Sequence, residues 1–593
     1  IRRFKPDLII NRFNHRNPGS THGHHTSSAM LSFEAFDLVG KANEYSDSAK
    51  QYGVWQPKRL LFNTSWWFYG SKDNFEKANK KNLLTVETGN YYTTLGLSNG
   101  EIAASSRSMH KSQGFGNTGV RGKQTEYLEF LKGDFPQNKM DLFDGINTTW
   151  SRIEGANKIG DILYSLEDNF NFRNPSMMIP KLLNAYELLL KLPESHWKVL
   201  KLKELKALIA NCAGLYLEVV SNQQNIIPNG DVTFTVEAIN RSDTQITIKR
   251  ISSPLVNFPA SLKEYTLEMN EKYNLESTIG TFSGKDYSSP YWLNEKGTMG
   301  MYQVNDKSIL GYPEKLMKFP VKFHLSINDV DINFERNIVY KFNDPVDGEV
   351  YQPFTIVPVA TCSIKEKVII FSDQKTKKIP VHIRAGKDNI EGIITLNSPE
   401  DWVIKPQSHP FSVEKKGDQS IVYFEVSPPK EISEGQLNPI IQIEEKTYDK
   451  ELHVLDYKYI PLQQVLMKSE SKVVHLILQK KGENIGYIEG AGDAVPESLE
   501  QIGYQVTRIK PAEITYDKLV KFDAIVMGIR AYNTVPELEF KQVELNRYIE
   551  NGGNLILQYN TSHRLITKDI APFQIELSRD RVTDEFSEVS FLA

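Results

Sequence analysis

Three histidines gather near the start of the chain, at positions 22, 24 and 25, although the 593 residues include only 12 histidines. His22 and His25 are three residues apart, so their imidazoles face the same side of a helical turn. Neutral imidazole is a common zinc ligand. A helix N-terminus adds free N–H groups and a positive dipole end, which suit an anionic reaction centre. The alternative is a polar loop whose histidines only cap the helix.

The segment ahead of these histidines favours a binding role. It follows a strand predicted at residues 7–11 and carries cationic and hydrogen-bonding side chains: Arg12, Asn14, His15, Arg16 and Thr21. In α/β proteins, ligands bind in the loops at the carboxyl ends of strands. We therefore expect this segment and the histidines to line one site.

Two motifs extend this pattern into a family resemblance. Arg-x-Asn-His at 12–15 and Thr-His-Gly-His-His-Thr at 21–26, followed by a helix, resemble the second half of a PIG-L/LmbE-type metal-dependent deacetylase domain. The stretch SMHKSQGFG at 108–116 is similar to the later His-x-Ser-Gln element of that family, with His110, Ser112 and Gln113 at its positions. The resemblance spans about residues 1–135, and the long chain resembles the large multidomain bacterial members of the family.

The resemblance implies a zinc-dependent enzyme, or one that uses another divalent metal, that removes an N-acetyl group from an N-acetylated amino sugar or glycoconjugate. It gives His25 the place of a metal ligand. It gives His22 the catalytic place, where a histidine steadies the oxyanion or protonates the leaving amine. The expected substrate-binding residues are Arg12, Asn14, His24 and His110.

The first metal motif of the family, of the type His-Pro-Asp-Asp, does not occur in the sequence. A catalytic zinc site usually has three protein ligands, so we expect the other ligands upstream of Ile1 and expect this chain alone to be inactive. Both ends read as cut through folded elements, which indicates a fragment, and any targeting signal would then be missing from it. By analogy with the large bacterial members, we expect a periplasmic or secreted protein.

Two other interpretations stay open at this point. One is a non-catalytic glycan-binding or scaffold protein with a decayed deacetylase domain, in which exposed aromatics such as Tyr287, Tyr291 and Trp292 stack on sugar rings. The other is a hydrolase centred on Ser562 and His563, which follow the last predicted strand.

The periodicity predicts a multidomain chain. Residues 1–155 have strand-type runs at 7–11 and 59–65 and helical spacing at 27–42 and 123–133, which predicts a partial, Rossmann-like α/β deacetylase domain. Residues 156–213 form a helical segment. Residues 214–345 and 346–462 alternate apolar and polar positions without helices between them, which predicts two β-sandwich modules.

Residues 463–593 return to alternating strands and helices, which predicts an open parallel sheet in an incomplete α/β domain. This part resembles class I glutamine amidotransferase-like domains, whose activity needs a cysteine nucleophile. The two cysteines, Cys212 and Cys362, both lie outside it.

Composition narrows the classes of function. The formal net charge of -4 shows no basic excess, so we expect no nucleic-acid partner. No run of about 18 apolar residues occurs, so we expect no membrane span. The wide separation of the two cysteines excludes a disulfide framework. The oligomeric state stays open.

Overall fold

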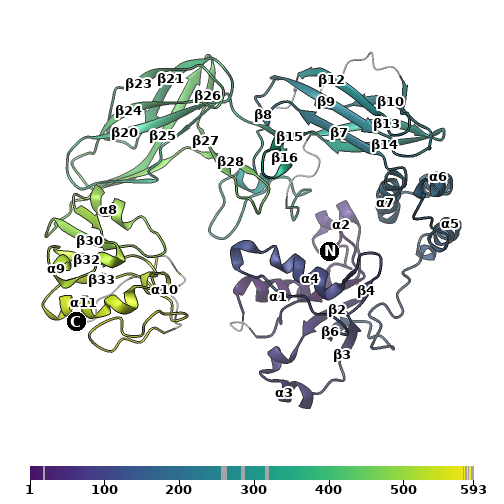
Figure 1. Ribbon diagram of the computed structural model, residues 1–593, viewed down its shortest axis with the longest axis horizontal. Coiled ribbons are helices and arrows are strands. Elements are labelled where there is room, and N and C mark those ends of the chain that lie inside the picture. The colour runs from purple at the N-terminus through teal and green to yellow at the C-terminus, as the bar shows by residue number, and fades with distance from the viewer. Residues whose placement is uncertain are drawn as a thin grey trace.

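The computed structural model describes residues 1–17, 21–255, 264–281, 287–313, 319–578 and positions 580, 582, 584 and 586–588. The C-terminal end that reads as cut through a folded element lies largely outside these residues. Figure 1 shows an N-terminal α/β part, a group of helices, two β-rich modules and a C-terminal α/β part. Both α/β parts lie on the same side of the pair of β modules. A multidomain chain with α/β and β-sheet parts is therefore confirmed.

The N-terminal part is built on a mixed sheet with the strand order β1-β2-β6-β3. Its strands are β1 (Leu8–Asn11), β2 (Arg59–Thr64), β3 (Leu83–Glu87) and β6 (Thr125–Gly133). β1 and β2 are parallel, whereas β6 is antiparallel to both β2 and β3. Helices α1 (Gly23–Leu38), α2 (Ser46–Tyr52), α3 (Lys72–Lys77) and α4 (Asn99–Ser108) and the short hairpin of β4 (Tyr91–Tyr92) and β5 (Leu97–Ser98) complete it.

The prediction of a helix at 123–133 is wrong, because residues Thr125–Gly133 form strand β6. Its apolar residues suit a helical period and a two-residue period equally. Pairing decides between them: β6 bonds to β2 on one side and to β3 on the other. Leu128 then packs with Leu61 and Leu84 in a small core that neither period reveals.

Helix α1 begins earlier than the predicted 27–42. It starts at Gly23 and ends at Leu38, with His22 as its N-cap residue. His24 and His25 therefore lie in the first turn of the helix and not in the connection before it.

The helical segment and the first β module share one hydrophobic core. Helices α5 (Asn157–Asp168), α6 (Ile179–Lys191) and α7 (His196–Cys212) contribute buried residues such as Leu182 and Ile209. These belong to the same cluster as Val219, Phe234 and Phe323 of the module. The three helices therefore pack against this module and form part of its core.

The first module has two facing sheets, with strand orders β12-β9-β7-β15-β16 and β11-β10-β13-β14. The strands are β7 (Tyr216–Ser221), β9 (Asp231–Ile239), β10 (Ile246–Ser252), β11 (Tyr265–Thr266), β12 (Lys272–Thr281), β13 (Pro320–Ile327), β14 (Val330–Asn337), β15 (Val339–Asp344) and β16 (Gly348–Pro353). The hairpin β15–β16 spans the boundary predicted at 345. The chain leaves this module through the short pairing of β8 (Asn225–Ile226) with β17 (Thr355–Ile356).

The second module has sheets with the orders β18-β20-β24-β22 and β19-β29-β25-β21-β23 around its own core. Its strands are β18 (Ala360–Ser363), β19 (Val368–Phe371), β20 (Lys377–Ala385), β21 (Ile390–Asn397), β22 (Val403–Lys405), β23 (Ser408–Val413), β24 (Gln419–Ser427), β25 (Ser433–Ile443), β26 (Lys446–Tyr448) and β29 (Ser471–His475). The pair β27 (Lys450–Leu455) and β28 (Gln463–Lys468) lies beside it. Strand β29 carries this module past the predicted boundary at 462.

The C-terminal part has the parallel order β31-β30-β32-β33, as the sequence predicts. Its strands are β30 (Asn484–Ile488), β31 (Gln505–Arg508), β32 (Ala524–Met527) and β33 (Leu555–Leu557). Helix α8 (Val495–Gln501) packs on one face, and α9 (Tyr516–Leu519), α10 (Ala531–Thr534) and α11 (Leu538–Glu550) pack on the other. Among the helices of the described residues, none has both the length and the apolar character needed to cross a bilayer.

A buried guanidinium holds the end of helix α1. Arg2 is only 4% exposed and donates hydrogen bonds to the backbone carbonyls of Leu38, Val39, Lys41, Glu44 and Tyr45, over 2.7–3.3 Å. The last carbonyls of a helix have no partner within it. Arg2 supplies that partner and fixes the helix that carries the histidines.

We expect Arg2→Met to lower the free energy of local opening around residues 38–45 by about 2–4 kcal/mol, because buried carbonyls lose their donor. Hydrogen exchange measured by mass spectrometry reports this as faster exchange of these amides. Arg3→Met is the matched control, since Arg3 donates instead to Ser308 and Leu310 of the first β module. Equal acceleration in both variants contradicts the assignment.

Candidate functional site

The site begins where two parallel strands end. β1 and β2 are in register from Leu8 opposite Arg59 to Asn11 opposite Phe62. Their carboxyl ends therefore meet at the same edge of the sheet. The chain leaves β1 at this edge and enters α1 at His22.

Two contacts anchor the segment that leaves β1. Arg12 donates a 2.7 Å hydrogen bond to the Asn63 side chain on β2. Arg16 forms a bidentate pair with Glu129 on β6, with N···O distances of 2.9 and 2.6 Å. Asn14 accepts hydrogen bonds from the backbone N–H and the Nε of Arg16. The segment is thus held against strands β2 and β6.

The structure brings the three predicted histidines together. The ring centroids of His24 and His25 are 4.0 Å apart, and the ring of His22 lies 5.7 Å and 5.9 Å from them. His22 and His24 are exposed, whereas His25 is half-buried with its ring stacked on Phe13 at 4.0 Å. The carbonyl of His22 accepts from the N–H groups of His25 and Thr26, which starts the helix.

The surroundings of two histidines, His25 and His15, lower the pKa of their imidazoles. Loss of hydration lowers the pKa of His25, and the neighbouring His24 and His22 lower it further. Burial also lowers the pKa of His15, which stacks on Phe33 at 4.2 Å, and Arg16 adds to this effect. A metal ligand must be the neutral form of histidine, and the lowered pKa of His25 favours that form.

Buried polar atoms without partners lie at the same edge. Within the described residues, the side-chain atoms Asn11 Nδ2, Thr26 Oγ1 and Thr64 Oγ1 are buried and make no hydrogen bond. Their residues are 8%, 4% and 1% exposed. Asn11 and Thr64 end β1 and β2, and Thr26 is in the first turns of α1. Since buried polar atoms normally have partners, this edge has unused capacity to bind.

Sequence reasoning missed these three residues as site candidates. A signal existed for two of them, because ligands of α/β proteins bind at the carboxyl ends of strands. Asn11 closes the strand predicted at 7–11, and Thr64 is the last residue but one of the strand predicted at 59–65. That they are buried without partners is a property of the fold alone.

The described residues do not supply a complete metal site. No group of three or more His, Cys, Asp or Glu side chains in the described part of the chain is arranged to hold an ion. His22, His24 and His25 are close to one another, but they are not such a set. A metal bound by His25 would need further ligands beyond the described residues.

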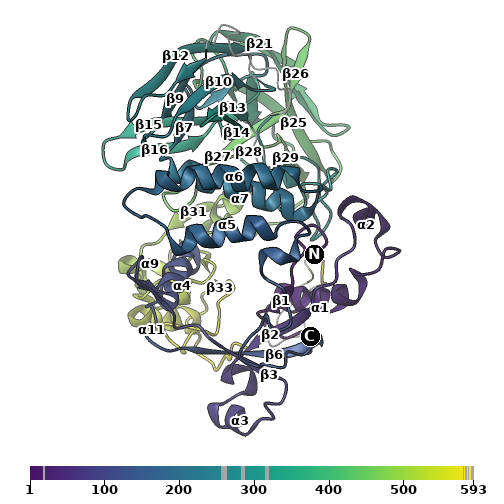
Figure 2. The same ribbon diagram turned by 90° about the vertical axis from the view of Figure 1, so that its right-hand side faces the viewer.

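The structure does not bring His110 to the other candidates. It follows helix α4, is exposed, and has its Nδ1 3.1 Å from the carbonyl oxygen of Arg107. Figure 2 shows α4 well apart from α1. Ser562 and His563 are also exposed.

The three aromatic residues considered for sugar stacking, Tyr287, Tyr291 and Trp292, all make contacts within the protein. Tyr287 packs against the module's core, and burial raises its pKa. Tyr291 donates to the carbonyl of Tyr312 at 2.7 Å and meets Trp292 edge-to-face, with ring centroids 5.0 Å apart. All three are half-buried.

No protein-family model and no curated protein matches the chain. Similar solved structures include a protein of unknown function from Porphyromonas gingivalis W83, at 11% identity over 44% of this chain and 99% of that one, with a TM-score of 0.14. The native conformation of Escherichia coli alpha-2-macroglobulin matches at 12% identity over 44% and 17% of the two chains, with a TM-score of 0.17. A family 123 glycoside hydrolase from Clostridium perfringens matches at 8% identity over 33% and 36%, with a TM-score of 0.14. TM-scores this low do not establish a shared fold or a shared function.

We expect Glu129→Gln to release Arg16 and to speed tryptic cleavage after it, because the bidentate pair is lost. The melting temperature should change little, since half-exposed pairs contribute at most about 1 kcal/mol. Limited proteolysis with mass spectrometry measures the rate. Glu76→Gln, which removes the exposed pair with Lys80, is the control and should leave the rate unchanged. An unchanged rate in Glu129→Gln would show that the pair does not hold this segment.

Proposed function

We propose that this chain is part of a metal-dependent hydrolase that removes the N-acetyl group from an N-acetylated amino sugar or glycoconjugate. The observation that carries the proposal is the histidine cluster at the start of α1, at the carboxyl edge of β1 and β2. The buried, unpartnered polar atoms of Asn11, Thr26 and Thr64 support it, because they show that the fold leaves hydrogen-bonding groups unsatisfied at the same edge. A periplasmic or secreted location belongs to the proposal and is taken from the family resemblance.

His25 is the ligand that this chain contributes to the metal, which is zinc or another divalent ion. The other ligands would come from a strand added to the free side of β1. Among the described residues β1 pairs only with β2, and Ile10 on β1 is 50% exposed. A strand with one free side presents unpaired N–H and C=O groups that can accept a neighbour.

The chain's own residues have separate roles in this proposal. When bound, the metal supplies Lewis-acid polarisation of the acetamide and lowers the pKa of water. His22 is exposed at the mouth of the helix, where its ring can donate a proton to the leaving amine or a hydrogen bond to the oxyanion. Arg12 and Asn14 hold the segment through hydrogen bonds with Asn63 and Arg16. We assign substrate binding to these two residues and to His24, which is exposed.

The two histidines should separate metal binding from turnover in the full-length protein. We expect His25→Ala to lower zinc content, measured by atomic absorption. We expect His22→Ala to keep its zinc and to slow acetate release from N-acetylated sugars by about 10²–10³-fold. Zinc content that is equal in the wild type and in His25→Ala overturns the ligand assignment.

A non-catalytic glycan-binding protein is the second candidate. A polar cavity lined by residues of both β modules, among them Gln223 and Arg384, favours it. The coding sequence upstream of Ile1 discriminates between the two. A His-Pro-Asp-Asp-type motif there supports the hydrolase, and a continuous domain without one supports the binding protein.

A further inference from the structure

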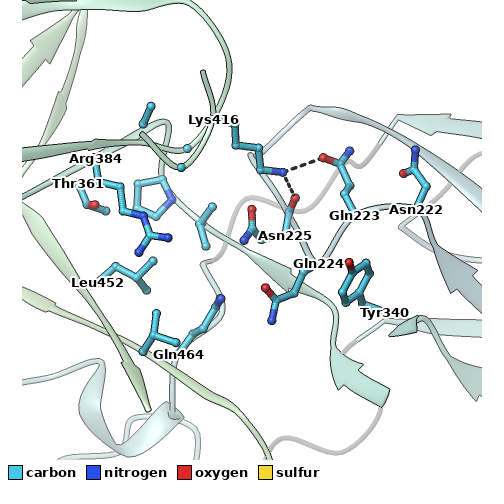
Figure 3. Close-up of a pocket in the computed structure, with 16 residues that line it drawn as sticks. Asn222, Gln223, Gln224, Asn225, Tyr340, Thr361, Arg384, Lys416, Leu452 and Gln464 are labelled. Carbon is cyan, nitrogen blue, oxygen red and sulfur yellow. Dashed lines mark hydrogen bonds between the residues drawn. The ribbon is translucent and has the colours of Figure 1, made fainter. Parts of the chain in front are cut away.

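A cavity of about 400 Å³ lies where the chain passes from the first β module to the second. Ligand sites commonly measure about 300–1,000 Å³, so the space suits one or two sugar rings. Figure 3 shows its polar lining, which comes from both modules. The residues on which the argument rests are Gln223, Gln224, Tyr340, Arg384, Lys416 and Gln464.

One wall is a run of consecutive amide side chains, Asn222-Gln223-Gln224-Asn225, which follows β7 and ends in the first residue of β8. Gln224 uses one N–H on Gln352 at 2.8 Å, so its carbonyl oxygen stays able to accept. Gln464 accepts from Thr355 at 2.6 Å, so its NH₂ group stays able to donate. Amides present donors and acceptors side by side, which matches the alternating hydroxyl groups of a sugar.

The lining of the cavity contains the cations Arg384 and Lys416 and no acidic residue. Arg384 enters it from β20 and is half-buried. Within the described residues, its guanidinium makes no hydrogen bond or ion pair, and no residue of the lining is Asp or Glu. Partial burial of a cation without a partner costs desolvation free energy. A carboxylate that accepts two N–H groups of the Arg384 guanidinium offsets this free energy.

The second cation also joins the modules. Lys416 donates to the side chain of Gln223 at 2.7 Å and to the backbone carbonyl of Asn225. Its backbone N–H is bound by Asp388, which lies outside the lining. Lys416 thus keeps the amide run beside Arg384 and adds to the positive potential. Leu452, Val454 and Tyr340 supply apolar surface for the C–H face of a ring.

We propose that this cavity binds an acidic saccharide, with the carboxylate of a hexuronate-type sugar on Arg384 and its hydroxyl groups on the amides of Gln224 and Gln464. This goes beyond the deacetylase proposal and does not rest on it, because binding here needs neither a metal nor turnover.

The test is calorimetric titration of this chain with glucuronate, glucose and inorganic phosphate. We expect the wild type to bind glucuronate with a Kd of about 1 mM or tighter and glucose at least about 10-fold more weakly. Added salt should weaken the binding of glucuronate. Equal affinity for glucuronate and glucose overturns the role of the carboxylate. Phosphate that binds as tightly as glucuronate overturns the saccharide assignment.

Arg384→Gln should weaken glucuronate binding about 10-fold or more, down to the level of glucose, because the bidentate contact is lost. The matched control is Arg250→Gln, an exposed arginine of strand β10 that does not line the cavity. It should bind glucuronate as the wild type does. Unchanged binding in Arg384→Gln, or equal loss in the control, overturns the site. The comparison of glucuronate with glucose on the wild type decides the matter if Arg384→Gln fails to fold.

Discussion

The parallel pairing of β1 with β2 is the constraint on which the histidine site depends. Parallel strands end at the same edge, so Asn11, Thr64 and the start of α1 meet there. An antiparallel β1 would carry the histidines to the opposite edge. The connection through α1 is stable because Arg2 satisfies the last carbonyls of that helix. The site is therefore positioned by backbone pairing first and by its own side chains second.

How far a sequence predicts such a fold depends on how local the deciding contacts are. The parallel C-terminal sheet was predictable, because each strand is a short apolar run followed by a helix with clear spacing. Strand β6 was not, since Tyr127, Leu128 and Phe130 fit either period and only β2 and β3 select the strand. The same holds for the module borders, where the hairpin β15–β16 is defined by pairing and not by composition.

The site follows the same rule. His22, His24 and His25 are neighbours in sequence, so any helix that starts there brings them together. The predicted link to His110 needed about 85 intervening residues to return to the same edge, and α4 lies elsewhere. The cavity between the β modules joins the amide run at 222–225 to Arg384 and Lys416, which are far from it in sequence. The short pairing of β8 with β17 helps bring these residues together, and no local sequence pattern predicts this pairing.

Three arginines show why residue type alone does not assign a role. Arg2 is buried among backbone carbonyls and holds a helix end. Arg16 is neutralised by Glu129 and fastens a connection. Arg384 points into a space whose lining has hydrogen-bonding groups and no acid.

A cation whose charge the fold already balances is structural, because a ligand gains nothing by replacing its partner. A cation that the fold leaves unbalanced lowers the free energy of any anion that reaches it. Function in this chain is therefore better read from the partners that a polar group lacks than from the group itself, and this applies equally to Arg384 and to the unpartnered atoms beside His25.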